Sequence, residues 1–330
     1  MSENILTVSS PTPVTYVEGR QRPSTSSRGP YEYVLLAAAS LFALIAAYFV
    51  GTVIWRAVPA FREQGFGFFS NAMWNASFDP AVPSQFGSLS MIIGTLITSG
   101  IAILIAVIVG TGTALAISFL LPTRLRTVAA TLIELLAAVP SVVYGIWGLV
   151  VLTPWFQYTV GPWLAGIPGF AWLFGTTAGG QCYLLAGLVL GAMILPSYVA
   201  IGREVINSVS KELIEASLSL GATQWQTLWK TVIPTARIGL FGAGTLALGR
   251  AIGETVAMSM VLGSALSTNY QLLKPGATLA GWIATQWGEA QGSSQVPALF
   301  ALGVILMVVS LSMSLISNRL VARQRRAATL

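Results

Sequence analysis

The sequence ELIEASLSLGATQWQTLWKTVIPTAR, residues 212–237, runs directly into IGLFGAGTLALGRAIGETVAMSMVLG, residues 238–263. The first half is a polar, basic loop. The second half is apolar and exceeds the roughly 20 residues that an α-helix needs to cross a bilayer. It nevertheless contains Arg250 and Glu254, although a charge at the bilayer centre costs roughly 3 kcal/mol on insertion scales. This stretch therefore predicts a soluble docking loop joined to a membrane helix with a special task.

Charged residues make up only 8% of the 330-residue chain, and hydrophobic residues make up 55%. Soluble proteins carry about 25% charged residues, so the composition predicts an integral membrane protein, in agreement with the mean hydropathy of +0.75. The chain has no histidine and one cysteine, Cys182. This excludes an internal disulfide, a Cys- or His-based metal site and catalysis by a Ser-His or Cys-His pair. We expect no metal site and no enzymatic activity of the chain itself.

Six apolar runs are long enough to span a bilayer. They are residues 33–55, 91–121, 128–152, 182–201, 238–263 and 296–317. We therefore predict an all-α integral membrane protein with six transmembrane helices. The second run is longer than one crossing requires, and we expect its helix to tilt or to project from the lipid before Pro122 stops it.

The distribution of Lys and Arg over the predicted loops indicates the orientation of the chain. With the N-terminus in the cytoplasm, 13 of the 17 cations fall on the cytoplasmic side and Arg56, Arg62 and Lys274 fall on the other. Cytoplasmic loops of membrane proteins carry such an excess of Lys and Arg, so the net charge of +6 reports orientation and not nucleic-acid binding. We predict a multi-pass protein of the cell (inner or plasma) membrane with both termini cytoplasmic.

The two ends of the chain differ from its apolar middle. Residues 1–30 are rich in Ser, Pro, Thr and Arg, a composition that cannot bury enough apolar surface to fold. We predict a disordered cytoplasmic tail there. No apolar run follows the start closely enough for a cleaved signal peptide. The transmembrane domain is then expected over residues 31–320, with a short basic cytoplasmic tail over 321–330.

The loop between the fourth and fifth apolar runs has the pattern of two short helices. Residues 212–220 favour a helix, and Gly221 suits the left-handed position that ends one. Thr223 and Gln226 match a T-x-x-Q capping box, which predicts a second helix. Pro234 is expected to stop that helix before the next span. A helix–Gly–helix elbow with apolar residues on its face is suited to docking into a groove of a soluble partner.

The spacing of Glu215-Ala216-Ser217, Gly221 and Pro234 resembles the EAA loop of ABC-importer permeases. In that family the loop forms a coupling helix, which seats in a cleft of a separate ATPase subunit. The resemblance implies this role for the loop over 203–237. The coupling residues that it implies are Glu215, Ala216, Gly221, Thr223 and Pro234. Three positions depart mildly from the family pattern: Ser217 where Ala is usual, Thr231 where a larger apolar residue is usual, and Ile233 for Leu.

Three further stretches resemble the phosphate-import permeases of this family. They are VPSVVYGIWGL at 139–149, LAGLVLGAMILPSYVAIGREVI at 185–206 and ALGRAIGETVAMSMVLG at 247–263. The order of elements and the loop sizes resemble the PstC-type subunit more than the PstA-type subunit. The resemblance covers roughly residues 31–320 and implies a type I ABC importer permease fold with its core at about 88–318.

The partners that this resemblance implies are separate proteins. The chain has no G-x-x-x-x-G-K-[ST] segment and therefore no P-loop of its own. The resemblance implies a PstA-type second permease subunit, a PstB-type ATPase dimer that binds ATP-Mg, and an extracytoplasmic PstS-type phosphate-binding protein. Membrane lipid surrounds the chain, no cofactor is expected on it, and no nucleic acid is expected to bind.

Arg250 and Glu254 are the first candidates for the substrate path. They are four residues apart, so on a continuous helix they share one face and neutralise each other. One interpretation is an ion pair that only pins helices together. The other is that Arg250 faces the translocation path and meets phosphate, because a guanidinium group matches phosphate oxygens with two parallel hydrogen bonds. Glu254 would then restrain Arg250 so that phosphate is not trapped.

Glu134 and Ser141 are further candidates for the path. Glu134 lies about 12 Å into the third predicted helix, counted from Arg126, and we favour a structural or gating role for it. Pro140 removes a backbone hydrogen bond and is expected to kink this helix. The freed carbonyls and Ser141 would be acceptable beside a water-lined path, although a packed kink is the simpler interpretation.

Three alternatives remain open on the residues. The chain could be a permease for another oxyanion such as sulfate or molybdate, because Arg250 would serve each anion. It could be an ion-coupled secondary transporter or channel that works alone, but this leaves the cytoplasmic elbow unexplained. An intramembrane enzyme is disfavoured, since the chain lacks histidine and has few carboxylates.

Overall fold

The structure is a computed structural model that describes residues 30–77, 84–176, 179–268, 270–290 and 294–328. The predicted disordered tail lies outside the described residues except for Pro30, which begins helix α1 (Pro30–Gln64). The chain divides into two units between Gly51 and Thr52. This boundary falls inside α1, and the sequence did not indicate it. The second unit contains every other described element.

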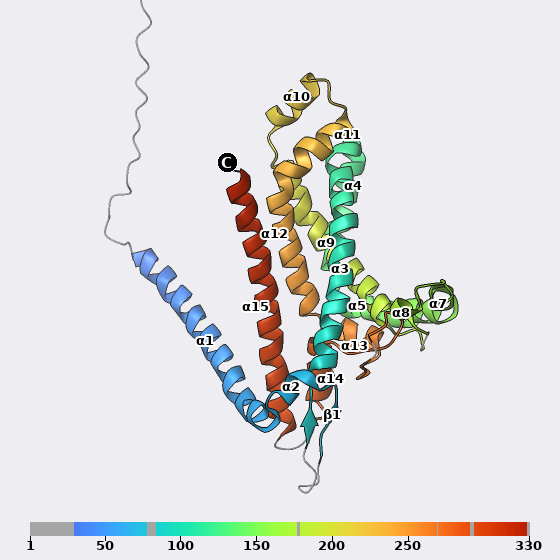
Figure 1. Cartoon of the computed structure of the whole chain (residues 1–330). Helices are drawn as coiled ribbons and strands as arrows, with labels where there is room; N and C mark the ends of the chain where they lie inside the picture. Colours follow the sequence, from blue (N-terminus) through green and yellow to red (C-terminus); the bar gives the residue numbers. More distant parts are fainter. Residues whose placement is uncertain (1–29, 78–83, 177–178, 269, 291–293, 329–330) are drawn as a thin grey trace, which may run out of the picture. The chain divides into compact units, whose positions relative to one another are not determined.

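Four long helices form the bundle of the second unit (Figure 1). They are α3 (Leu89–Leu115), α9 (Tyr183–Asn207), α12 (Ile233–Ile252) and α15 (Gln295–Ala328). α3 packs along α9, and α12 contacts α3, α9 and α15. α15 continues to Ala328, so residues 321–328 of the predicted basic tail are helical.

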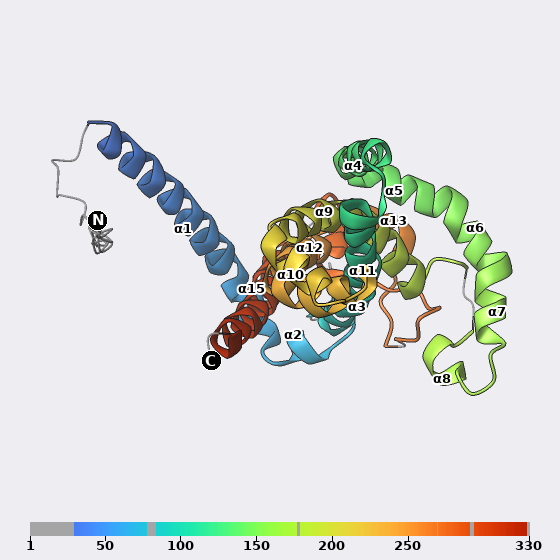
Figure 2. The same ribbon diagram turned by 90° about the horizontal axis from the view of Figure 1, so that it is seen from above.

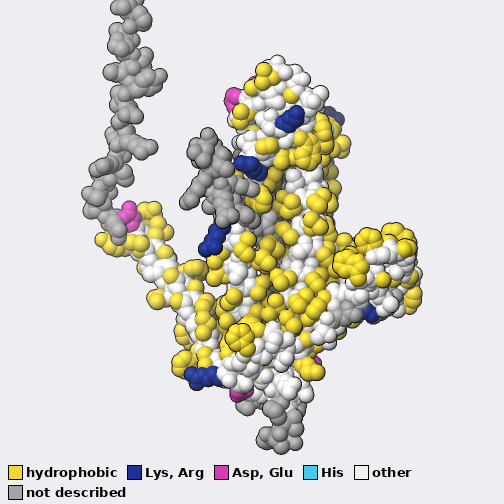
Figure 3. Space-filling view, in the orientation of Figure 1, with side chains coloured by type: hydrophobic (Ala, Val, Ile, Leu, Met, Phe, Trp, Pro, Cys, Tyr) yellow, Lys and Arg dark blue, Asp and Glu magenta, His cyan; other side chains and the backbone are white. Residues whose placement is uncertain are grey.

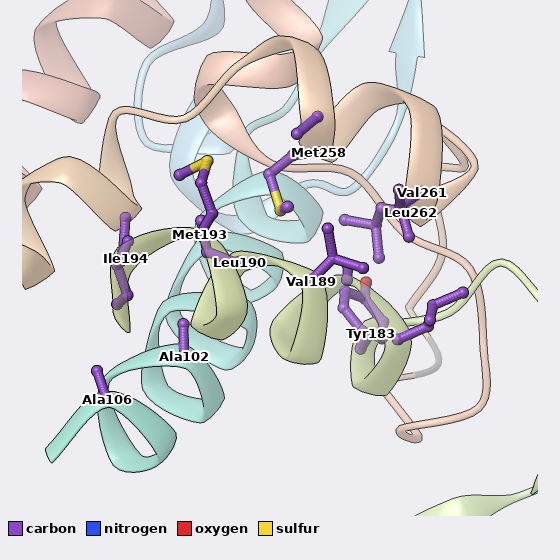
Figure 4. Close-up of a cluster of buried hydrophobic side chains, with 14 of the residues drawn as sticks. Ala102, Ala106, Tyr183, Val189, Leu190, Met193, Ile194, Met258, Val261 and Leu262 are labelled. Carbon is purple, nitrogen blue, oxygen red and sulfur yellow. The ribbon is translucent and has the colours of Figure 1, made fainter. Parts of the chain in front are cut away.

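Small residues allow α3 and α9 to approach each other closely. Ala102 and Ala106 of α3 are fully buried in the core, and Figure 4 shows both on the turns that run beside α9. On α9, a Cβ atom added to Gly187 would come within 2.6 Å of the Cβ of Ile101. Helices in lipid associate through such close van der Waals contact, since the lipid removes the hydrophobic driving force between them.

Five described helices are long and apolar enough to cross a membrane, and a bent pair makes a sixth if it counts as one span. The predicted six-helix, all-α membrane fold is therefore confirmed with one qualification about the third span. The long second run ends where it was predicted to end. α3 continues into a π-helical segment, η1 (Ala116–Leu120), and the helix ends there, just before Pro122.

The third predicted span is broken at Pro140. Helix α4 (Thr123–Ala138) and the helical stretch that begins at Ser141 meet at 89°. The residue before a proline avoids the α region, and Val139 accordingly has an extended ψ of 128°. The predicted kink at Pro140 is confirmed in position, but it is a bend of 89° between two helices and not a kink within one helix over 128–152.

The stretch after this corner leaves the side of the bundle (Figures 1 and 2). It comprises α5 (Ser141–Trp147), η2 (Gly148–Leu152), α6 (Thr153–Trp155), η3 (Phe156–Val160), α7 (Gly161–Ala165) and α8 (Ala171–Phe174). The chain returns to the bundle at Cys182, which precedes α9 and is buried.

The fifth predicted span is also divided. α12 ends at Ile252, and a short helix, α13 (Val256–Leu262), begins after a break over residues 253–255. Glycine disfavours a helix interior by about 1 kcal/mol relative to alanine, and Gly253 stands at the break. Gly263 then ends α13 with a left-handed φ of 90°. A continuous helix over 238–263 was therefore the wrong prediction.

A small cap lies at the end of the bundle opposite the elbow (Figure 1). It contains α2 (Gly67–Ser70), the paired strands β1 (Trp74–Asn75) and β2 (Gln85–Phe86), and α14 (Leu279–Trp287). The strands are antiparallel, with Trp74 opposite Phe86. A second buried cluster joins Phe86 to residues of α14 and α15, including Trp282 and Leu299. Apart from these two short strands, the elements of the described residues are helices.

Candidate functional site

Arg250 lies in the last turn of α12 and is exposed on this chain. Its Nη1 donates a hydrogen bond of 2.8 Å to the hydroxyl of Ser197 in α9. The carbonyl end of a helix carries a partial negative charge, which stabilises a cation in the last turn. The guanidinium group is therefore oriented by one hydrogen bond and by the helix end, and it keeps further N–H donors for an anion.

Glu254 does not pair with Arg250. Since α12 ends at Ile252, the two side chains are not on one helical face, and the ion pair that the described residues contain is Arg203–Glu134. The Glu254 carboxylate instead accepts a long hydrogen bond of 3.4 Å from the backbone N–H of Ala257, in the first turn of α13. The predicted i,i+4 pair was therefore wrong. Arg250 lies at the C-terminal end of α12, which carries a partial negative charge, and Glu254 lies at the N-terminal end of α13, which carries a partial positive charge.

The segments that follow the two breaks pack against each other. A Cβ atom added to Gly145 of α5 would lie 2.8 Å from the Cα of Ala257 in α13. On the neighbouring residue, the Tyr144 hydroxyl donates to the carbonyl of Leu136 at 3.1 Å, across the corner at Pro140. Broken membrane helices whose ends meet in this way form substrate sites in other transporters.

Ser141 is the first residue of α5 and stands at the same corner. It is half-buried. The predicted path residues Ser141, Arg250 and Glu254 therefore lie at or next to the two breaks in the chain. Ser197 could not be predicted, because a hydroxyl contact between residues 53 positions apart leaves no local pattern in the sequence.

Glu134 belongs to a separate contact. Its carboxylate lies 3.4 Å from Nη2 of Arg203 in α9, and the two side chains are 62% and 23% exposed. Arg203 was assigned to the loop, but α9 continues to Asn207 and carries it. The pair joins α4 to α9. Exposed ion pairs contribute at most about 1 kcal/mol, so this contact is a weak link between helices.

The elbow after α9 has the local structure that the sequence predicted. Helix α10 (Lys211–Ser219) is followed by Gly221 with a left-handed φ of 86°. Helix α11 (Gln224–Thr227) starts with the predicted capping box. The backbone N–H of Gln226 donates to Thr223 Oγ1 at 3.2 Å, and the Thr223 N–H donates to Gln226 Oε1 at 3.0 Å.

Pro234 does not stop the helix after the elbow. The chain is helical without interruption from Gln224 to Ile252, a length of 29 residues or about 43 Å. A π-helical segment, η4 (Leu228–Val232), precedes Pro234, which occupies the first turn of α12. Inside a continuous membrane helix a proline is tolerated where a local π-helical adjustment gives the freed backbone groups other partners. One continuous helix therefore joins the elbow to Arg250.

The outer surface of the elbow is exposed and apolar. Leu220, next to Gly221, is 89% exposed, and Trp225 and Trp229 are 62% and 53% exposed. Their rings meet edge to face at 5.7 Å. Glu215 and Ala216 are also exposed on α10. Large apolar side chains that protrude from a polar loop are typical of a surface that a partner covers.

Two of the three departures from the EAA pattern, Ser217 and Thr231, contact each other beneath this surface. The Ser217 hydroxyl lies 3.0 Å from the Thr227 hydroxyl, and the Thr231 hydroxyl donates to Ser217 at 3.4 Å. These hydrogen bonds link α10 to α11 and η4. Ser217 and Thr231 stand where the family pattern has apolar residues, and with Thr227 they form a cluster of hydroxyl groups at the inner side of the elbow.

Residues 102–326 match the family model described as "Binding-protein-dependent transport system inner membrane component". The match covers more than half of the chain. The chain belongs to this family. It is thus a multi-pass membrane protein of the type that serves as the permease component of importers, and the resemblance seen in its EAA loop is confirmed.

Curated relatives within the family are similar over most of their length. The phosphate transport system permease protein PstC of Mesorhizobium japonicum is 40% identical over 82% of this chain and 81% of its own length. PstC of Pasteurella multocida is 37% identical, with 86% and 88% covered. The probable PstC of Methanocaldococcus jannaschii is 33% identical, with 86% and 89% covered.

Solved structures of ABC importers share the fold. A chain of the bacterial alginate ABC transporter, in complex with its alginate-bound periplasmic protein, matches with a TM-score of 0.58 and 18% identity, covering 89% of this chain and 95% of that one. A chain of the inward-facing MetNI methionine ABC transporter matches with a TM-score of 0.51 and 18% identity, covering 70% and 93%. This chain therefore has the type I ABC importer permease fold.

The described residues contain no group of three or more His, Cys, Asp or Glu side chains that could hold a metal ion. The candidate site combines the guanidinium group of Arg250 with the hydroxyl of Ser197, and this chemistry suits the recognition of an anion.

Proposed function

We propose that the chain is a permease subunit of an ATP-driven importer that carries inorganic phosphate into the cytoplasm. The observation that carries this proposal is the similarity to PstC proteins, 40% identical over 82% of the chain in one case. The exposed arginine at the break in α12 supports it, because phosphate is an anion at neutral pH and an uncharged path would oppose its passage.

The proposal includes an orientation and a set of partners. The elbow and both termini lie in the cytoplasm, as the distribution of Lys and Arg favours. A PstB-type ATPase dimer binds and hydrolyses ATP-Mg, and this chain performs no catalysis. A PstA-type permease subunit completes the membrane path, and an extracytoplasmic PstS-type protein delivers phosphate.

The continuous helix from Gln224 to Ile252 supplies the mechanical link in this proposal. The ATPase grips the exposed surface around Leu220 and Trp225 and moves the elbow when its nucleotide state changes. Because no break separates the elbow from Arg250, the movement of α11 is carried to the far end of α12. There it shifts the guanidinium group relative to Ser197 and α13, and so alternates the access to the anion.

Arg250 holds phosphate only transiently in this mechanism. One of its donors is already used by Ser197, and Glu254 lies just beyond, at the start of α13. A carboxylate near the path repels a bound anion and limits its residence. Glu254 therefore keeps the affinity of the site for phosphate low. It does so by repulsion and not by the ion pair with Arg250 that the sequence predicted.

ATP-dependent uptake of labelled phosphate tests the proposal, with the chain purified in its complete complex and reconstituted in proteoliposomes. We expect uptake only with ATP and the binding protein, and we expect excess phosphate to compete. Competition by sulfate or molybdate without competition by phosphate would assign the chain to another oxyanion. Uptake by the chain alone, without an ATPase, would overturn the importer mechanism.

A further inference from the structure

A long groove runs between α3, α12 and α15 in the second unit, on the half of the bundle nearer the elbow. Its volume is about 700 Å³, which lies within the range of ligand sites. Its wall is mainly apolar. Representative lining residues are Ile103, Val107, Ile108, Phe241, Leu248 and Ile316. Figure 3 shows apolar side chains over much of the surface of these helices. We call this feature the α3–α12–α15 groove.

The hydroxyl groups in the wall of the groove already have partners. Thr111 and Tyr198 share a hydrogen bond of 2.9 Å, and Thr245 bonds to Ser317. Arg237 differs from them. It lines the groove, is half-buried, and has no acidic side chain within ion-pair distance among the described residues. A half-buried cation beside an apolar groove is stabilised by an anion that the chain does not itself provide.

The dimensions of the groove fit one leaflet of a bilayer. Arg237 and Leu248 are both in its wall, and 11 helical residues separate them by about 16 Å. Half of a hydrocarbon core of about 30 Å is about 15 Å. Trp229 lines the groove beyond Arg237, and tryptophan favours the membrane–water interface. With Arg237 at headgroup level, this spacing puts Leu248 near the bilayer centre.

We propose that the α3–α12–α15 groove binds a phospholipid with an anionic headgroup. The headgroup phosphate pairs with Arg237, and an acyl chain lies between α3 and α12. Basic pockets between membrane helices recognise anionic lipids by this combination of charge and apolar length. The inference does not depend on which substrate the chain transports. It places a lipid against α12, the helix that joins the elbow to Arg250.

Photo-crosslinking of a lipid probe tests this site in the complete complex, reconstituted in nanodiscs. The probe is phosphatidylglycerol with a diazirine on its acyl chain. We expect labelled peptides from residues 103–115, 237–248 and 313–317. Arg237→Gln should lower this labelling about fivefold, as expected for the loss of one cation near the membrane surface. The matched control is Lys230→Gln, an exposed cation on the same continuous helix that does not line the groove.

A second pair of variants tests the apolar part of the groove. Gly112 lines the groove and Gly100 does not, yet both are on α3 and a Cβ atom added to either would meet nothing within 4 Å. Gly112→Leu should fill the groove and lower the labelling, whereas Gly100→Leu should not. Because neither position is crowded, both variants are expected to assemble normally.

Three results would overturn the lipid site. The first is equal labelling of the groove by phosphatidylcholine, which has no net charge. The second is loss of labelling in excess inorganic phosphate, which would indicate a site for the free anion. The third is a crosslink from cysteines placed in the groove to the second membrane subunit, which would show that a protein helix occupies it.

Discussion

Pro140 and Pro234 both stand between two helical segments, but the chain behaves differently at each. At Pro140 the preceding residue is extended, with ψ 128° at Val139, and the flanking helices meet at 89°. At Pro234 the preceding residue, Ile233, keeps a helical ψ of −47°, and the helix continues. The difference teaches that a proline permits either a sharp bend or an uninterrupted helix, and that the neighbouring packing selects between them.

The packing differs at the two prolines. After Pro140, α5 turns toward α13 and fits closely because Gly145 has no side chain. Around Pro234, Val232 and Ala236 are buried in the cluster that joins α9, η4 and α12, and a straight course keeps both there. The π-helical segment η4 lies just before the proline, and such a local adjustment gives the backbone groups freed by a proline other partners. The bend at Pro140 brings α5 to α13 beside the charged site, and the continuous helix through Pro234 connects this site to the elbow.

The largest expected effect is on the corner itself. Proline disfavours a helix interior by about 3 kcal/mol, so Pro140→Ala should let α4 and α5 straighten. Spin labels at the exposed positions Leu132 and Val150 should then move from about 19 Å to about 27 Å apart, since 18 helical residues span 27 Å when straight. Pulsed electron paramagnetic resonance measures this distance.

Pro234→Ala is the matched control for this experiment. It removes a proline that causes no corner, so the distance between the same two labels should stay constant. Cys182 is only 2% exposed, and it should not compete for the label. An unchanged distance in Pro140→Ala would mean that packing alone makes the corner.

Arg250→Ala should lower ATP-driven phosphate uptake about 30-fold, the loss of about 2 kcal/mol that one charge-assisted hydrogen bond contributes. Initial rates in proteoliposomes give the value. Arg250→Lys should have an intermediate effect, because lysine retains the charge but not the two-pronged geometry. Co-purification of the partner subunits should be unaffected. Normal uptake by Arg250→Ala would reduce this residue to a structural role.

Gly221→Val should weaken the binding of the ATPase about tenfold. A β-branched residue in the left-handed region costs about 1–2 kcal/mol, which distorts the elbow at the end of the continuous helix. Titration of the complex with the ATPase subunit measures the change. Asparagine tolerates this conformation, and Gly221→Asn should therefore bind nearly as well as the wild type. Equal weakening by both variants would argue against the backbone explanation.

The smallest effect is expected at the link between α4 and α9. Glu134→Gln and Arg203→Gln should each lower stability by less than about 1 kcal/mol, because the pair is exposed. Thermal unfolding of the purified complex checks this. Uptake should be nearly normal. A loss of uptake greater than tenfold with unchanged stability would instead indicate the gating role that the sequence left open for Glu134.

Much of the elbow was predictable because its interactions are local. Gly221 and the Thr223–Gln226 capping box depend on residues at most three positions apart, and such patterns are visible in one sequence. The apolar runs likewise predicted where the long helices lie, because bilayer thickness sets their length. The breaks at Pro140 and Gly253 were less accessible, since a proline or a glycine only permits a break.

The sequence by itself determined the membrane class, the approximate spans, the elbow and the presence of an arginine in an apolar run. The tertiary structure decided that Arg250 bonds to Ser197, that Glu254 faces the start of α13, and that Glu134 pairs with Arg203. These contacts join residues on different helices, 53 and 69 positions apart for the two arginines. The physical reason is that hydropathy depends on each residue and its near neighbours, whereas the partner of a charged side chain depends on which helices pack together.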